Sequence, residues 1–234
     1  MPGKPRPFHV DTTIAAPHKA VWQALTEPAL LGQWFGWEHP HLAAEIQHLF
    51  GDHLIAEPPV QLRFDDGSHL ALLANGPRTT ICAVMPGVAG PRPEVADSAE
   101  EGWRTFLAQL RFFLETQPPG TRRTVHLEAT IVPADALAAV VGRPWLDSRH
   151  QRIVVDPAGH LLALVADHPI STPAAGPVAL TVTTYGLDDA RFDAVARRWR
   201  QRWSDAPDLT VTLADAAPYP SRAEPPFGEV SRPA

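Results

Sequence analysis

Residues that could cross-link the chain are scarce in this sequence. Its 234 residues include a single cysteine, Cys82. The chain therefore cannot form an internal disulfide, and a metal site made of cysteines alone is excluded. Cys82 lies in an apolar run typical of a strand, so we expect a buried and unreactive thiol.

Long apolar runs and an excess of positive charge are also absent. No window approaches the roughly 18 consecutive apolar residues of a membrane span, and the opening residues, MPGKPRPFHV, lack the apolar run of a secretory signal. We therefore expect a cytoplasmic protein without a membrane span. The formal net charge of −6 argues against nucleic acid as the main partner.

Familiar catalytic and metal-binding motifs are missing as well. The sequence has no Gly-x-Ser-x-Gly nucleophile elbow, no phosphate-binding glycine loop and no His-Glu-x-x-His motif. His39, His41, His48 and His53 form only a loose group, whereas zinc needs three or four ligands that converge in space. We expect these to be surface or loop histidines, and we expect neither a metal nor a cofactor.

The first half begins with a strand and two short helices. Residues 8–14 alternate apolar and polar side chains, as a half-buried strand does. Pro17 permits a helix to begin, because its missing N–H costs nothing in a first turn. Thr26 is a suitable N-cap for a second helix that starts near Pro28 and leads into the aromatic segment Trp34-Phe35-Gly36-Trp37.

A meander of short strands and a long helix complete this half. β-rich runs at 41–50, 59–64, 68–74 and 78–85 are separated by turn signals such as Asp-Gly and Asn-Gly, which favours antiparallel hairpins. Residues 98–115 predict a helix, in which Ser98 and Glu101 have the spacing of a capping box. Its apolar stripe consists of Trp103, Phe106, Leu107, Leu110 and Leu114.

The second half repeats this order of elements. Three of its segments match segments of the first half in the same order: 126–133 with 9–17, 156–169 with 65–77, and 174–189 with 74–89. A helix over 188–203 closes this half, with Phe192, Val195, Ala196, Trp199 and Trp203 on its apolar stripe and five arginines mostly off it. We interpret this half as a shortened, degenerate copy with fewer strands. The predicted divisions are domains at 1–117 and 121–215, joined by TQPPG (116–120), and a Pro-rich tail at 216–234.

The segments IAAPHKAVWQALTEPALLGQWFG (14–36) and EEGWRTFLAQLRFFLE (100–115) resemble the SRPBCC superfamily of START-like and birch-pollen-allergen-like proteins. Within it they are most similar to the activator of heat-shock-protein-90 ATPase homologue group. The resemblance implies an α+β helix-grip fold in tandem, in which a curved antiparallel sheet surrounds a long C-terminal helix and leaves a cavity. It implies no particular chemistry, because one fold hosts many functions.

Large side chains near the ends of these two segments are the candidate ligand-binding residues: Trp34, Phe35, Trp37, Trp103, Phe106, Leu107 and Leu110. Aromatic rings can stack on an apolar ligand, but they also dominate protein cores, so both roles stay open. His9 and Asp11 share a strand face, as do Gln61, Arg63 and Asp65, with His69 beginning the next run. In a cavity such groups could transfer protons, but strand alternation favours the solvent face.

We therefore predict a non-catalytic protein that binds a small hydrophobic molecule in the cavity of the first domain. The alternatives are an enzyme similar to polyketide cyclases and aromatases, or a co-chaperone-like protein-interaction module. An apolar cavity with few titratable groups would favour binding. A histidine–carboxylate pair in that cavity would favour an enzyme, and a filled cavity beside an exposed hydrophobic patch would favour the interaction module. The sequence assigns no catalytic residue and leaves the oligomeric state open.

Overall fold

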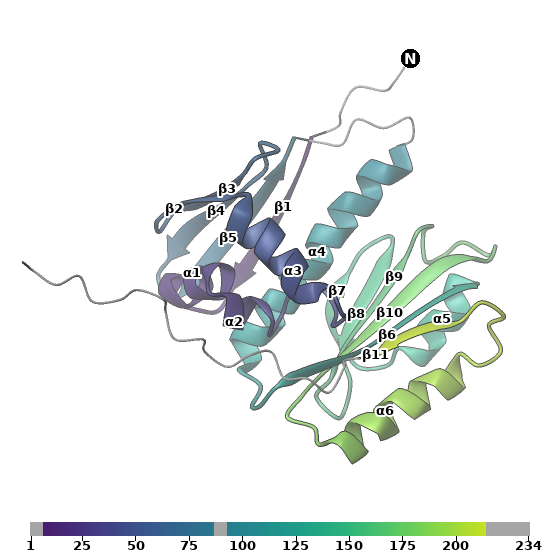
Figure 1. The fold of residues 1–234 in the computed structure, drawn as a ribbon. Coiled ribbons are helices and arrows are strands. Elements are labelled where there is room, and N and C mark those ends of the chain that lie inside the picture. Colours follow the sequence, from purple (N-terminus) through teal and green to yellow (C-terminus); the bar gives the residue numbers. More distant parts are fainter. Residues whose placement is uncertain (1–6, 87–92, 214–234) are drawn as a thin grey trace, which may run out of the picture.

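The computed structural model describes residues 7–86 and 93–213. These residues form an α+β structure with two antiparallel sheets, one in each half of the chain (Figure 1). The predicted α+β class is confirmed. Among the described residues, no helix is both long and apolar enough to cross a membrane.

The first sheet has five strands in the order β1-β5-β4-β3-β2. They are β1 (Phe8–Ile14), β2 (Leu54–Glu57), β3 (Gln61–Phe64), β4 (His69–Asn75) and β5 (Arg78–Met85). The predicted strands at 8–14 and 78–85 are confirmed as β1 and β5. Phe8, Val10 and Ile14 are buried, so the period-2 pattern identified the inner face of β1 correctly.

The helical segments of the first half are α1 (His18–Thr26), α2 (Pro28–Leu31), α3 (Leu42–Gln47), the π-helical turn η1 (His48–Asp52) and α4 (Pro93–Thr116). The predicted β-rich run at 41–50 is wrong, because most of this segment forms α3 and η1. Leu42, Ile46 and Phe50 are all buried, and their spacing of four residues is that of one helix face.

Two predicted helix caps are also wrong. Thr26 ends α1, and its hydroxyl donates a hydrogen bond back to the Trp22 carbonyl at 2.9 Å, whereas Glu27 is the N-cap residue of α2. Since α4 begins at Pro93, Ser98 lies within the helix and does not cap it. Glu101 has a different role, described below.

The second sheet has six strands in the order β11-β6-β10-β9-β8-β7. They are β6 (Arg122–Ile131), β7 (Arg143–Asp147), β8 (Gln151–Val155), β9 (Leu161–Ala166), β10 (Gly176–Tyr185) and β11 (Thr210–Leu213), accompanied by α5 (Pro133–Ala139) and α6 (Asp189–Arg202). The prediction of fewer strands in this half is wrong. The edge strands β7 and β11 are short, and most of their residues are half-buried or exposed. Their sequences therefore show little of the apolar–polar alternation that would identify a strand.

The two sheets share one strand order. The orders are β1-β5-β4-β3-β2 and β6-β10-β9-β8-β7. In each, the strand that comes first in the chain pairs with the one that comes last, and the remaining strands lie beside it in reverse chain order. The three matching sequence segments contain β1 and β6, β4 and β9, and β5 and β10, which hold the same places in the two sheets. β11 is an addition that pairs with the free side of β6. This shared order is the one that an internal repeat requires.

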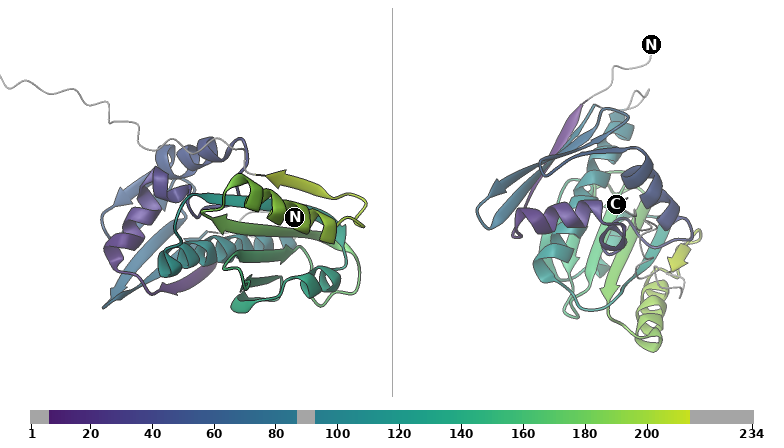
Figure 2. Two further views of the ribbon diagram at one scale, coloured as in Figure 1. Left: turned by 90° about the horizontal axis from the view of Figure 1, so that it is seen from below. Right: turned by 60° about the vertical axis from the view of Figure 1, so that its left-hand side comes forward.

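The long helix α4 packs between the two sheets (Figures 1 and 2). Leu107 and Leu110 belong to the core of the first half. Ala108 and Phe112 belong to a second cluster with Ile153 and other residues of the second sheet. The predicted stripe therefore describes only one of two buried faces of α4. The two halves are in contact, as the short linker suggests.

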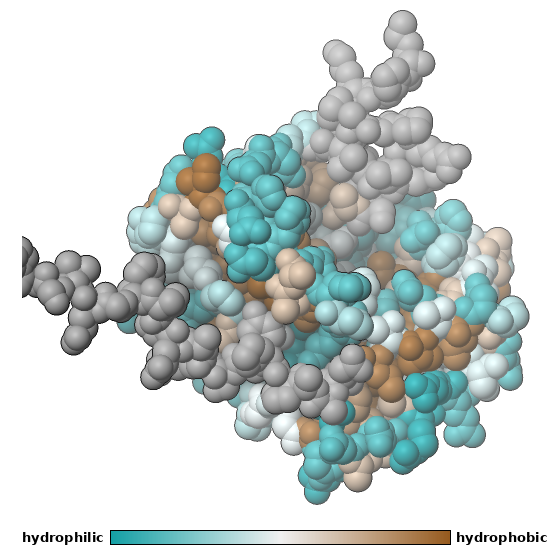
Figure 3. All heavy atoms as spheres, in the orientation of Figure 1, coloured by the Kyte–Doolittle hydropathy of each residue, from teal (hydrophilic) through white to brown (hydrophobic). Residues whose placement is uncertain are grey.

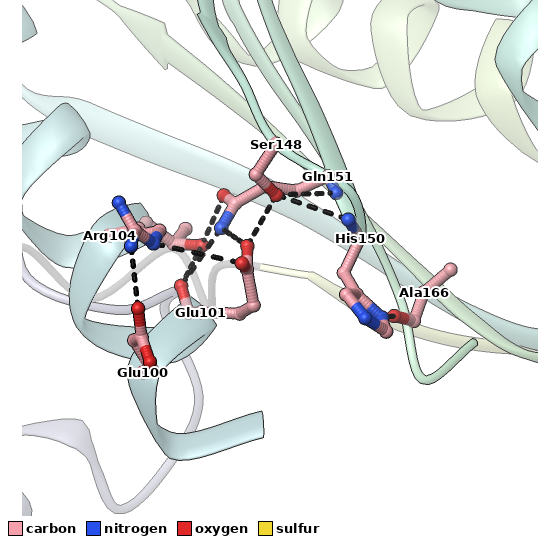
Figure 4. A network of polar contacts seen from close by, with 8 residues as sticks. Glu100, Glu101, Arg104, Ser148, His150, Gln151 and Ala166 are labelled. Carbon is pink, nitrogen blue, oxygen red and sulfur yellow. Dashed lines mark hydrogen bonds and ion pairs between the residues drawn. The ribbon is translucent and has the colours of Figure 1, made fainter. Parts of the chain in front are cut away.

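Glu101 fastens the N-terminal part of α4 to the hairpin formed by β7 and β8 (Figure 4). Its carboxylate accepts hydrogen bonds from Ser148 Oγ at 2.6 Å and from Gln151 Nε2. Arg104 lies 3.7 Å from the same carboxylate, and Thr105 Oγ1 donates to Gln151 Oε1 at 2.9 Å. The residue expected to cap the helix instead joins the two halves.

Polar side chains of the first sheet point away from its core. His9 and Asp11 are exposed, and the register places both His9 and His69 opposite Val84 of β5. Cys82 lies opposite Asp11 and is half-buried, so the expected buried position is wrong. Desolvation and the neighbouring Asp11 raise the pKa of the Cys82 thiol to about 11, which leaves it protonated and weakly nucleophilic near neutral pH.

The outward face of α6 is strongly polar. Phe192, Ala196, Trp199 and Trp203 are buried on its inner face, as the predicted stripe requires. The arginines of the other face are all exposed: Arg191, Arg197, Arg198, Arg200 and Arg202. Figure 3 shows this helix as a hydrophilic lower edge of the molecule.

Candidate functional site: an aromatic pocket in the first half

The four residues of the segment Trp34-Phe35-Gly36-Trp37 have four different structural roles. Trp34 is 1% exposed, and its indole Nε1 donates a hydrogen bond to the Ala24 carbonyl at 2.8 Å. In a continuous helix that carbonyl would accept from residue 28, but Pro28 has no N–H. Trp34 therefore satisfies a helix-end carbonyl that the proline leaves without a backbone donor.

Gly36 presents its carbonyl to the second half of the chain. Its φ of +57° lies in the left-handed region that favours glycine. The Arg122 guanidinium, which is 1% exposed, donates to the carbonyls of Phe35 at 2.8 Å and of Gly36. Gln109 of α4 donates to the Gly36 carbonyl at 3.1 Å. One buried cation thus joins the aromatic segment to β6.

Trp37 completes this junction. Its indole stacks on the His126 imidazole, with ring centroids 4.0 Å apart and an interplanar angle of 9°. Next to it, the Glu38 N–H donates to Thr124 Oγ1 at 2.7 Å, and the Thr124 N–H donates to Glu38 Oε2 at 2.6 Å. Burial raises the pKa of Glu38, against the opposing effect of Arg122. Burial also lowers the pKa of His126, which favours the neutral form of the ring that stacks on Trp37.

Phe35 belongs to a closed ring of five aromatic side chains, which we call the aromatic collar. Its members are Phe35, Phe50, Phe64, Trp103 and Phe106. Successive ring centroids lie 5.2, 6.0, 6.4, 6.0 and 4.7 Å apart around the cycle. These separations are typical of interacting aromatic pairs.

The collar borders a cavity of about 440 Å³. All five collar residues line it, together with Leu49 and Met85. Phe35 and Phe50 are buried, whereas Phe64, Trp103 and Phe106 are only half-buried. The collar is therefore closed on the core side and open on the other, as a ligand-binding cleft must be.

Polar groups stand at the mouth of this cavity. His53 and Asp65 line it, and His53 Nδ1 lies 2.7 Å from Asp65 Oδ2. The register explains their proximity. Leu54 of β2 pairs with Phe64 of β3 at the end of the antiparallel ladder, and His53 and Asp65 are the next two residues beyond that pair. The His48 ring lies edge-on to His53, with centroids 4.3 Å apart.

The seven predicted ligand-binding residues separate into two groups. Phe35, Trp103 and Phe106 line the cavity. Trp34, Leu107 and Leu110 are core residues with 0–1% exposure, and Trp37 stacks on the second half of the chain. None of these last four is among the residues that line the cavity.

Sequence reasoning missed most of the cavity's other residues. The sequence patterns place Phe50 in a β-rich run and Phe64 at the end of a strand, and neither pattern indicates a cavity. The helical spacing of Leu42, Ile46 and Phe50 is the signal that could have placed Phe50 inside. The pairing of His53 with Asp65 had no sequence signal, because it depends on the register of β2, a strand that was not predicted.

The histidines do not form a metal centre. Across residues 7–86 and 93–213, no group of three His, Cys, Asp or Glu side chains is placed to hold a metal ion. His39 instead lies 3.1 Å from Glu45 through its Nε2 atom, and His53 lies beside Asp65.

Comparison with known proteins identifies distant similarities of structure. No family model matches the chain, and no curated protein matches it. DynU16, a protein of the dynemicin biosynthetic locus, is 17% identical with a TM-score of 0.37, over 85% of this chain and 95% of that one. The di-domain ARO/CYC protein BexL of the BE-7585A pathway is 12% identical with a TM-score of 0.33, over 84% and 92%.

A second di-domain ARO/CYC protein, StfQ of the steffimycin pathway, is 10% identical with a TM-score of 0.31, over 83% of this chain and 92% of that one. These similarities are distant and do not assign a function. The closer likeness to the activator of heat-shock-protein-90 ATPase homologue group remains an expectation.

Proposed function

We propose that the first half of this protein binds a small, flat, largely apolar molecule inside the aromatic collar. The observation that carries this proposal is the cycle of five aromatic contacts whose members all line one cavity of about 440 Å³. A cavity of this size suits a small organic molecule, and aromatic walls favour a planar ring system that can stack or meet them edge-on.

The largely apolar inner wall of the cavity supports binding as the primary role. This wall is formed by aromatic side chains, Leu49, Met85 and one buried polar residue, Ser68, whose hydroxyl donates to Asp66 Oδ1. The more exposed lining residues are His48, His53, Asp65 and Asp66. An apolar interior with a polar entrance fixes the orientation of a ligand that has one polar end. Side chains do not fill the cavity, whereas a filled cavity is the feature expected of an interaction module. The His53–Asp65 pair, which also lines the cavity, is the feature named above as favouring an enzyme, so a catalytic role like that of polyketide cyclases and aromatases is the second candidate.

Binding of 2-naphthol, followed by equilibrium dialysis, tests this proposal. The probe has 11 non-hydrogen atoms. At about 0.4–0.5 kcal/mol per atom, we expect a Kd of about 0.1–1 mM. The absence of saturable binding at several times that concentration would contradict the proposal.

Two tryptophan variants locate the binding site. Trp103→Ala removes one wall of the collar and should weaken 2-naphthol about two- to tenfold, because an aromatic pair contributes about 0.5–1.5 kcal/mol. Trp22→Ala is the matched control: Trp22 is also half-buried and packs against the same core, but it does not line the cavity. Equal losses in both variants would show that the probe binds elsewhere.

A further inference from the structure

The His53–Asp65 pair at the mouth of the collar has a defined hydrogen-bond polarity. An ionised carboxylate can only accept hydrogen bonds. The Nδ1 atom of His53, 2.7 Å from Asp65 Oδ2, must therefore carry the hydrogen in this contact. In a neutral imidazole the other nitrogen, Nε2, is then an acceptor.

The His53–Asp65 contact contributes little to the stability of the fold. The side chains of His53 and Asp65 are 43% and 59% exposed, and exposed pairs of this kind contribute little to stability. Both residues nevertheless line the cavity, and the register of β2 and β3 holds them opposite each other. A polar pair among the residues that line an apolar cavity can contact the polar end of a bound molecule.

We infer that His53, oriented by Asp65, selects flat aromatic ligands that carry a hydrogen-bond donor at one end, such as a phenolic hydroxyl. The ring system of the ligand would lie inside the collar, and its O–H would donate to His53 Nε2 at the mouth. This inference rests on the proposed function, because it requires that the collar binds the ring system. Asp65 acts as a positioning residue, since it sets which nitrogen of His53 accepts.

Two probes of nearly equal shape test the inference. 2-Naphthol carries an O–H donor, whereas 2-methoxynaphthalene carries only an acceptor oxygen. We expect the intact protein to bind 2-naphthol about three- to tenfold more tightly, which is the affinity difference of one neutral hydrogen bond. Both affinities can be measured by equilibrium dialysis with the protein in excess.

Three variants of the full chain separate His53 and Asp65 from other causes. His53→Phe keeps a ring of similar shape without nitrogens and should remove the preference. Asp65→Leu removes the carboxylate that accepts from Nδ1, so the hydrogen is no longer held there and Nε2 can become the N–H donor; the preference for 2-naphthol over 2-methoxynaphthalene should fall. His9→Phe, on the exposed outer face of β1, is the matched control and should keep the preference.

The outcomes distinguish this inference from the proposed function. If the intact protein binds both probes equally well, the collar binds aromatic rings but His53 does not select among them, and the inference is overturned. The same conclusion follows if His53→Phe retains the preference. Unchanged selectivity in Asp65→Leu would overturn the positioning role of Asp65. If neither probe binds the intact protein, the proposed function itself fails.

Discussion

Substitution of Arg122 by methionine is expected to loosen the junction between the two halves of the chain. Arg122 is 1% exposed, and methionine has a similar length but no hydrogen-bond donor. The Phe35 carbonyl would lose its donor at 2.8 Å, whereas the Gly36 carbonyl would keep Gln109. Arg122→Met therefore leaves at least one buried carbonyl without a partner.

The magnitude follows from two opposing effects. A buried polar group left without a partner costs about 1–3 kcal/mol, and Glu38 also loses a nearby positive charge. Against this, the variant no longer buries a cation, whose desolvation lowers the pKa of Arg122. Because loss of one member from a buried charged arrangement costs about 3–5 kcal/mol, we expect a net loss of about 2–4 kcal/mol in the free energy of unfolding.

Equilibrium unfolding in urea measures this difference. Arg63→Met is the matched control, because the Arg63 side chain is 59% exposed and its ion pair within the described part of the chain is with the exposed Glu57. It should change the free energy of unfolding by less than about 0.5 kcal/mol. If Arg122→Met costs no more than this control, the guanidinium does not stabilise the junction, and the reasoning is refuted.

Two further predictions concern the tryptophans and His126. Trp34→Phe should lower the free energy of unfolding in urea by about 1–3 kcal/mol more than Trp199→Phe. Both indoles are buried, but of the two only Trp34 has a partner for its N–H among the described residues, the Ala24 carbonyl. Equal losses in the two variants would contradict this role of the Trp34 N–H. Burial lowers the pKa of His126 from 6.5, so below pH 6.5 the unfolded chain binds a proton that the folded chain does not. The free energy of unfolding therefore decreases as the pH is lowered, until the pH is below the folded-state pKa. His126→Gln should make that fall shallower in thermal unfolding between pH 7 and 5, and an unchanged slope would count against a buried neutral imidazole.

Much of the fold could be predicted from the sequence, because local patterns encode it. The alternation in residues 8–14 identified β1, and the three matching segments identified pairs of strands that hold the same places in the two sheets. The helix over 188–203 was predicted with its buried stripe. These features depend on hydrophobic periodicity, which a single sequence displays directly.

The site was predicted less well, because it depends on contacts between distant segments. Phe35, Trp103 and Phe106 were expected near one another, but Trp34 turned out to replace the missing N–H of Pro28, and Trp37 to stack on the second half. Both roles need tertiary partners, the Ala24 carbonyl and the His126 ring. A tryptophan in a sequence does not show which of its surfaces will be buried, or against what.

The central claim is that the aromatic collar holds a small molecule. Native mass spectrometry of the full-length protein, purified gently from its host, tests this claim most directly. We expect a bound small molecule that is released on denaturation, is present in Trp22→Ala and is depleted in Trp103→Ala. Repeated preparations that contain only the bare chain, or a bound molecule retained equally by both variants, would contradict it.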